Sequence, residues 1–333
     1  MAKMAAAALM AWLACAGIAE GRAQTAPPEV VDLAPVVVSG VQPGPGMWRV
    51  TAPDGHTLWI LGTVSPLPAR LEWRADEVRA VIASADAVLG APGWTLDADV
   101  GFFSRLTLLP SAMKAQHDPH GRRLQEVLPP ALYARWQPLK ARYLGRGNGV
   151  EKDRPLVAAT RLYVAALDEV GLSPRSGVGK LLEKAYKARG LTPVVTRVEI
   201  KVDDPRAALK EVRTRPLQDV TCLQRTLDVV EHQLPLLVDR ANAWAVGDIE
   251  ALQQLALKSQ YDACIGAIAD SEAGRRRGMT DLDARAAEKW LGAARAALAA
   301  NAVTFATVPV HALVEPGGYL DRLRQQGYVV QSP

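Results

Sequence analysis

A serine and a histidine near opposite ends of the chain have residue types and positions suited to chemistry. Ser65 closes the run Gly62-Thr63-Val64-Ser65, and His311 follows Val308-Pro309-Val310. Each lies just beyond a predicted strand, where a turn can aim a side chain back over the strand end. A Ser-His pair catalyses acyl transfer when an acid orients the histidine. The sequence identifies no such acid, and Ser65 lacks the G-x-S-x-G elbow, so a structural loop histidine is the competing interpretation of His311.

The elements that must position these side chains come from both ends of the sequence. Near the start, the pattern predicts a hairpin over 48–65 with an Asp54-Gly55 turn, a helix over 74–85 and a strand over 86–89. Near the end, it predicts a helix over 282–300, a strand over 303–308, a short helix over 319–326 and a strand over 327–330. Strand-helix-strand order favours parallel pairing, and functional sites form at the carboxyl ends of parallel strands.

The residues between these segments, about 97–300, have mainly helical patterns. Breaks are expected at Pro110, Pro129-Pro130, Pro155 and Pro174, and one more strand is predicted over 190–196. Apolar residues from Val220 to Trp244 alternate at spacings of three and four, which indicates a long helix that Pro235 should kink. The predicted fold class is α/β, with a mixed sheet formed from N- and C-terminal segments and a large helical insertion.

The first residues have the features of a secretory signal peptide. Lys3 precedes an apolar run over 4–19, and Gly21-Arg22-Ala23 matches a small-x-Ala cleavage site. The sequence therefore predicts a signal peptide over 1–23, a Pro/Gly-rich tether over 24–46, a single folded domain over 47–330 and a periplasmic or secreted location. Cys15 leaves lipidation as an alternative. No later segment resembles a transmembrane helix.

Export bears on the two remaining cysteines, Cys222 and Cys264. An even pair in an exported protein favours a disulfide, which would join two helices and close a loop of about 43 residues. Two buried thiols are the alternative.

Other polar features are typical of solvated surface. The formal charge is only +4, and the basic run over 275–277 is short and flanked by glycines. It has no interleaved aromatic residues, so nucleic acid is not an expected partner. His117 and His120 flank a proline at a spacing that is not a recognised metal motif, which indicates a loop.

Two segments together resemble the TraB/GumN family, whose eukaryotic relatives include the Tiki metalloproteases. The first is the hairpin over 48–65, and the second is the closing run over 305–330, with His311, Gly317-Gly318, a short helix and Gly327-Tyr-Val-Val330. The resemblance spans Met47 to Val330 and is specific at these two ends. It implies the family's fold and a metal-dependent hydrolase ancestry, with Gly62, Thr63, Ser65 and His311 at the motif positions.

The chain departs from the family pattern at the positions that supply polar groups. Ser65 stands where the family's first G-x-x-H has a histidine, and residues 89–93 contain no acid where the family carries a glutamate. Val308 replaces the glycine of the second motif, although His311 remains. Because a transition-metal site generally needs three or four protein ligands, no cofactor is expected, and a divalent metal would be present only if the family chemistry persists.

Three functional hypotheses follow. The preferred one is an exported family member that has lost the metal-dependent hydrolase site and acts by binding a protein or ligand partner that the sequence does not identify. The second is a protease- or esterase-type hydrolase with a rebuilt site that uses Ser65 and His311 as catalytic residues. The third is an exported assembly or polysaccharide-associated factor, which rests on the family name and the export signal alone.

Overall fold

The computed structural model describes residues 40–97, 102–214, 219–255, 264, 269, 272–276 and 278–333. The predicted signal peptide and residues 24–39 of the predicted tether lie outside the described residues. The described residues belong to one compact unit that spans 33–333. No helix among them is long and apolar enough to cross a membrane.

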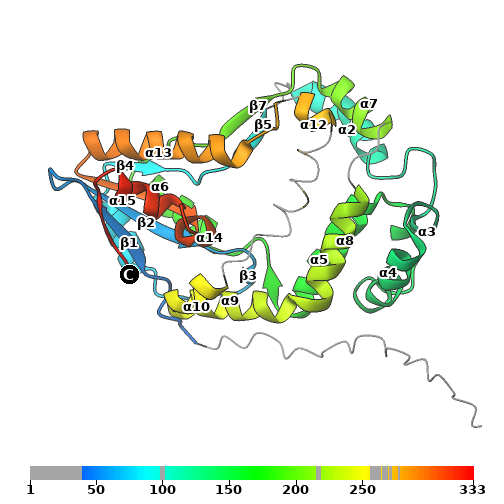
Figure 1. Ribbon diagram of the computed structural model, residues 1–333, viewed down its shortest axis with the longest axis horizontal. Helices are drawn as coiled ribbons and strands as arrows, with labels where there is room; N and C mark the ends of the chain where they lie inside the picture. The colour runs from blue at the N-terminus through cyan, green and yellow to red at the C-terminus, as the bar shows by residue number, and fades with distance from the viewer. Residues whose placement is uncertain are drawn as a thin grey trace, which may run out of the picture. The chain divides into compact units, whose positions relative to one another are not determined.

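A five-stranded mixed sheet joins the two ends of the chain, as predicted (Figure 1). Its strand order is β4 (Ala87–Leu89), β8 (Val303–Pro309), β2 (Thr57–Thr63), β1 (Met47–Thr51) and β9 (Val329–Gln331). Strand β8 pairs in parallel with both β2 and β4, whereas β1 pairs antiparallel with β2 and β9. The parallel strands expected at the start of the chain are therefore separated by a strand from its end.

The opening hairpin forms because the Asp54-Gly55 turn and the apolar run that follows it favour the same pairing of β1 with β2. Thr51 pairs with Thr57 across a turn in which Gly55 has a φ of 89°, a conformation that glycine adopts without strain. The His56 backbone N–H donates to Asp54 Oδ1 and fixes the turn. Leu58, Ile60 and Leu61 are fully buried, as a strand covered on both faces requires.

Helix α13 (Leu282–Ala300) lies lengthwise over the sheet and contacts β2, β4 and β8 (Figure 1). The sheet region also contains α1 (Asp76–Ser84), α14 (Val310–Val314) and α15 (Tyr319–Gln325). Large side chains fill the core, and the most fully buried among the described residues include Trp48, Trp136, Trp244, Trp290 and Phe305. Because aromatic burial is so large per residue, these few rings supply much of the driving force for folding.

Two further short strand pairs join segments that precede the helical insertion to strands inside it. β3 (Leu67–Pro68) pairs with β6 (Leu172–Ser173), and β5 (Trp94–Asp97) pairs in parallel with β7 (Val198–Lys201). The described helices of the insertion are α2 (Phe102–Lys114), α3 (Leu124–Val127), α4 (Pro130–Tyr143), η1 (Val150–Lys152), α5 (Pro155–Glu169), α6 (Val178–Ala188), α7 (Pro205–Thr214), α8 (Asp219–His232), α9 (Leu234–Val246), α10 (Ile249–Gln254) and α12 (Glu272–Arg276).

The strand predicted over 190–196 is wrong, since the strand of this region is β7, at 198–201. Val194 makes only an isolated bridge with Leu89, in which the Val194 N–H donates to Val88 O and the Gly90 N–H donates to Val194 O. The bridge nevertheless covers the outer edge of β4.

The predicted proline breaks are partly wrong. Pro235 does not kink one long helix, because α8 ends at His232 and Pro235 lies in the first turn of a separate helix, α9, where its missing N–H costs nothing. Pro130 and Pro155 also begin helices. Pro110, in contrast, lies inside α2 instead of ending it.

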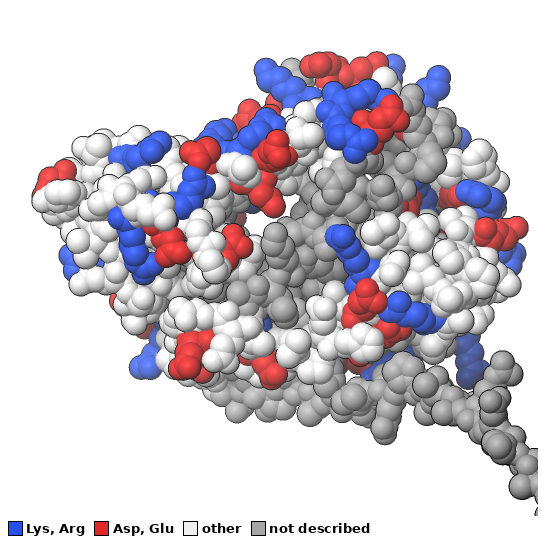
Figure 2. Space-filling model, in the orientation of Figure 1, with Lys and Arg blue, Asp and Glu red and all other residues white. Residues whose placement is uncertain are grey.

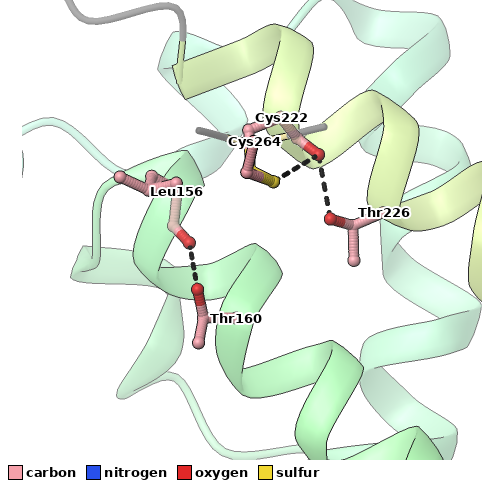
Figure 3. The surroundings of a disulfide bond; sticks show 5 residues. All are labelled: Leu156, Thr160, Cys222, Thr226 and Cys264. Carbon is pink, nitrogen blue, oxygen red and sulfur yellow. Dashed lines mark hydrogen bonds between the residues drawn. A yellow bond between two sulfur atoms is a disulfide. The ribbon is translucent and has the colours of Figure 1, made fainter. Parts of the chain in front are cut away.

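Cys222 and Cys264 form a disulfide, with a Cα–Cα distance of 4.7 Å. Figure 3 shows Cys222 on α8, with Leu156 and Thr160 of α5 nearby. The Thr226 hydroxyl donates to Cys222 O, so the turn of α8 that carries the disulfide is held by a side-chain hydrogen bond (Figure 3). The predicted cysteine pairing is thus confirmed.

The described end of the tether, residues 40–46, is hydrogen bonded to the domain. Gln42 forms a bridge with Trp73, and the Gly44 N–H donates to Ala245 O. The Trp73 ring packs edge-on against Trp244 at a centroid distance of 5.5 Å. The approach to β1 is therefore fixed by contacts with two distant parts of the chain.

Candidate functional site

A cavity of about 380 Å³ lies beyond the carboxyl ends of β4 and β8, the two strands at one side of the sheet. Pro92, Gly93 and Trp94 line it from the segment after β4, and Pro309 and His311 line it from the end of β8. This is the location at which open α/β sheets bind their ligands, because loops from neighbouring parallel strands converge there. The volume is in the range of pockets for small molecules.

His311 lines this cavity from α14, the short helix that begins directly after β8. The sheet positions it through close packing at the end of β2. A Cβ placed on Gly62 would lie 2.6 Å from Trp48 Cζ3 and 2.8 Å from Val310 Cγ2. Gly62 is therefore the residue that allows Val310, and with it α14, to pack against the sheet. The Trp244 Nε1–H donates to Gly62 O and fixes the same point from α9.

Charged groups of both signs line the cavity together with His311. Asp283 comes from the first turn of α13, Glu315 follows α14, and Arg197 immediately precedes β7. All three side chains are exposed, and no ion pair links them to one another among the described residues. Figure 2 shows Lys, Arg, Asp and Glu interspersed on one face of the molecule. Neither sign dominates the coloured part of that face.

Tyr319, at the start of α15, adds a buried phenol to the cavity wall. Its side chain is 7% exposed, and its ring packs edge-on against Trp290 at a centroid distance of 5.0 Å. Burial raises the pKa of Tyr319, Arg322 lowers it, and Asp283 and Glu315 raise it further. The phenol therefore stays protonated at neutral pH and lies in the electrostatic field of both acids.

The segment after β4, where the resemblance of the sequence would place an acid, is held by hydrogen bonds to its backbone carbonyls. Gly90 O accepts hydrogen bonds from the Thr196 hydroxyl and from Trp290 Nε1–H, and Ala91 O accepts from the same hydroxyl. Thr196 is 1% exposed. These hydrogen bonds fix the backbone that leads to Gly93 and Trp94, and no carboxylate takes part in them.

Ser65 lies two residues beyond β2, and the neighbouring pairing of β2 with β8 places it at the same edge of the sheet as His311. Its side chain is exposed, and its carbonyl oxygen accepts a hydrogen bond from the buried Arg240 guanidinium at 2.7 Å. Ser65 is not among the described residues that line the His311 cavity. The adjacency of the two predicted strands is thus present, whereas a Ser65–His311 catalytic pair stays a prediction.

The donor set at this edge does not fit the divalent metal that the resemblance of the sequence implies. Among the described residues, no group of three or more His, Cys, Asp or Glu side chains is arranged to hold a metal ion. His311 is the cavity's only imidazole among the described lining residues, and Arg197 puts a permanent positive charge on the same cavity. Ser65 supplies a hydroxyl where the first motif would supply a second imidazole.

The two histidines of the segment 117–120 have different surroundings. His117 Nδ1 lies 3.1 Å from Asp153 Oδ1, and Arg161 pairs with the other oxygen of that buried carboxylate. The His120 side chain is exposed. His117 therefore helps to join the segment after α2 to η1 and α5.

Fold and site together define an α/β protein with a sheet built from both chain ends and a ligand-sized cavity at its carboxyl edge. The chain belongs to the TraB/PrgY/gumN family, whose model matches residues 46–332. The match covers both of the motif-bearing ends and the helical insertion between them. A comparison with curated proteins and one with solved structures found no match.

Sequence reasoning identified His311 but missed the other polar groups of its cavity. Asp283, Glu315 and Tyr319 lie close to predicted element boundaries, and the Tyr319 position is part of the family's closing run. No sequence pattern marked Arg197 as a cavity residue, because its location in space depends on where the helical insertion returns to the sheet. Only the folded chain places it beside residues more than 80 positions away.

Proposed function

We propose that this chain is an exported TraB/PrgY/gumN family protein that binds a small ligand in the His311 cavity and lacks the family's metal-dependent hydrolase site. The observation that carries the proposal is the composition of the cavity wall. One imidazole, one guanidinium, two carboxylates and a buried phenol surround a space of about 380 Å³. Such a set of dispersed polar groups is suited to orienting a bound molecule.

The positions that would complete a metal site support the same proposal. Ser65 replaces one ligand, and backbone carbonyls with their hydrogen-bond donors occupy the segment in which the family carries its acid. Transition-metal sites need three or four protein ligands in a close arrangement, and among the described residues His311, Asp283 and Glu315 do not form such a group.

The test is metal analysis of the purified mature protein with added manganese, cobalt and zinc, combined with assays on peptide and ester substrates. We expect less than one metal ion per protein molecule. We also expect no peptide or ester hydrolysis that depends on His311, so that His311→Ala and the native protein give the same result. Tight, stoichiometric metal together with His311-dependent hydrolysis would contradict the proposal. Circular dichroism of His311→Ala serves as the folding control.

Export is the second part of the proposal, and it rests on the signal-peptide pattern of residues 1–23. We expect the mature protein to begin at Gln24 and to be recovered from the periplasm or the medium. Mass spectrometry of the N-terminal peptide measures this directly. An unprocessed chain in the cytoplasmic fraction would overturn it.

A hydrolase with a rebuilt site is the second candidate function. It is favoured by the parallel pairing of β2 with β8, which brings the ends of the Ser65 and His311 strands to one edge of the sheet. The variants Ser65→Ala and His311→Ala test it in the same peptide and ester assays. Activity that survives both substitutions would end this candidate, whereas loss in both with the fold retained would favour it.

A further inference from the structure

We propose that the ligand of the His311 cavity is a small zwitterion, with an ammonium group bound by Asp283, Glu315 and the Tyr319 hydroxyl and a carboxylate bound by Arg197. This inference rests on the proposed ligand-binding function and adds the chemical class of the ligand. A free α-amino acid with an apolar side chain is the simplest molecule of that class.

The acidic half of the cavity is suited to an ammonium group. Asp283 and Glu315 come from different elements, line the same cavity as Tyr319 and both act electrostatically on its phenol. The phenol is nine-tenths buried, lines the cavity and has no hydrogen-bond partner among the described residues. An ammonium group has three N–H donors and no acceptor, so two carboxylates and a phenol oxygen satisfy it fully.

The basic half of the cavity is suited to a carboxylate. The Arg197 guanidinium forms no hydrogen bond or ion pair with another described residue, although two acids line the same cavity. The backbone that carries this side chain is held, since Lys289 Nζ donates to Arg197 O at 2.5 Å. A guanidinium presents paired N–H groups that match the two oxygens of a carboxylate.

Most of the remaining wall is apolar, and His311 adds one imidazole to it. Trp94, Ala286 and Ala312 are among its apolar members. Gly93 adopts a φ of 143°, a conformation that a residue with a Cβ would adopt only with strain. A ligand with separated opposite charges and an apolar side chain would therefore match the charged and the apolar parts of the wall, whereas a pure anion would be repelled by the two acids.

The experiment is isothermal titration calorimetry of the full mature protein with L-alanine, L-leucine and L-phenylalanine. Each amino acid is compared with its N-acetyl form, which lacks the ammonium group, and with its amide, which lacks the carboxylate. We expect at least one free amino acid to bind tenfold or more tightly than both of its blocked forms, because each blocked form leaves charged groups of the cavity unpaired.

Variants test which group of the ligand each half of the cavity binds. Arg197→Gln should weaken binding of the free amino acid at least tenfold and leave binding of its amide unchanged. The double variant Asp283→Asn/Glu315→Gln should also weaken binding of the free amino acid at least tenfold, and it should leave binding of the N-acetyl form unchanged. Arg70→Gln, at an exposed arginine outside the cavity lining, is the matched control and should change nothing.

Absence of binding by all three free amino acids, or equal binding by the free and blocked forms, would overturn the proposal of a zwitterionic ligand.

A separate measurement tests the proposed ligand-binding function itself. Ala287→Trp, which places a bulky ring on the cavity wall, should abolish the binding of any cavity ligand. If a screen of neutral sugars, simple amines and simple carboxylates finds a ligand that this variant no longer binds, the binding function stands and only the ligand class is wrong.

Discussion

At the scale of single residues, Gly62 links the opening hairpin to the candidate site. It ends the apolar part of β2, receives the indole hydrogen bond of Trp244 and leaves room for Val310 next to His311. The family motif therefore has a packing function at this position that is independent of any metal. A side chain here would displace the helix that carries His311.

We expect Gly62→Ala to lower the free energy of unfolding by about 1 to 3 kcal/mol, because the added Cβ would overlap the buried Trp48 ring and Val310. Urea unfolding monitored by tryptophan fluorescence measures the change. Gly147→Ala is the matched control, since a Cβ at Gly147 has no neighbour within 4 Å. Equal stability of the two variants would refute this account of Gly62.

At the scale of elements, a disulfide and several prolines constrain the helical insertion in addition to its apolar core. The disulfide ties α8 to Cys264, and prolines decide where several helices begin. Both constraints can be tested by substitutions that leave the sheet and its cavity untouched.

Removing the disulfide with Cys222→Ser/Cys264→Ser should lower the free energy of unfolding by roughly 4 kcal/mol, the chain-entropy value for a loop of this length. Urea unfolding of the oxidised native protein and of the double variant provides the comparison. As a control, a reducing agent should destabilise the native protein and leave the double variant unchanged. A native protein that is insensitive to reduction would contradict a stabilising disulfide.

Pro138 and Pro130 occupy different positions of the same helix, α4, and both are exposed. Pro138 lies inside the helix, where it removes a hydrogen bond and crowds the preceding turn, so Pro138→Ala should stabilise the protein by about 1 to 2 kcal/mol. Pro130 begins the helix, so Pro130→Ala should be neutral or slightly destabilising. Thermal unfolding of the two variants measures the difference, and the opposite order would refute this assignment of α4.

At the scale of the whole molecule, the order β4-β8-β2 makes the sheet depend on contacts between the two ends of the chain. Thr57 pairs with Val303 and Thr63 pairs with Pro309, so about 245 residues separate partners in neighbouring strands. The closure of such a long loop is entropically costly, and contacts of this kind slow folding. The same closure creates the edge at which the cavity lies.

Three buried tyrosines on different helices give the whole molecule a shared response to alkaline pH. Burial raises the pKa of Tyr163 to about 12, with Arg240 lowering it, and burial also raises the pKa values of Tyr186 and Tyr319. The unfolded chain loses these protons near pH 10, whereas the folded protein keeps them. The contribution of these tyrosines to the free energy of unfolding should therefore be fully present below about pH 10 and should be lost as the pH rises toward about 12.

Urea unfolding from about pH 8 to about pH 11.5 measures this dependence. Tyr163→Phe should show a shallower fall, because its contribution of about 2 kcal/mol across that range is removed. Tyr133→Phe, at a tyrosine that is not buried, should keep the full slope. A slope unchanged by Tyr163→Phe would contradict the burial effect at this residue.

The sequence was sufficient to predict the elements whose signals are local. The hairpin follows from an Asp54-Gly55 turn and an apolar run, α13 from its periodic alanines and leucines, and the family from residues at both ends. It also indicated the Cys222–Cys264 pair and His311 as a motif position. The strand predicted over 190–196 and the kink at Pro235 were wrong because tertiary pairing and helix capping, rather than local pattern, decide those boundaries.

Only the tertiary structure decided that β8 lies between β2 and β4, and that His311 faces a cavity shared with Arg197, Asp283, Glu315 and Tyr319. The reason is physical. A strand pattern records which faces are buried but not which strand is the neighbour, and a charged residue in a loop has no periodicity to locate it. Ser65 and His311 are near their expected elements, but the chemistry available to His311 is set by neighbours that long-range pairing supplies.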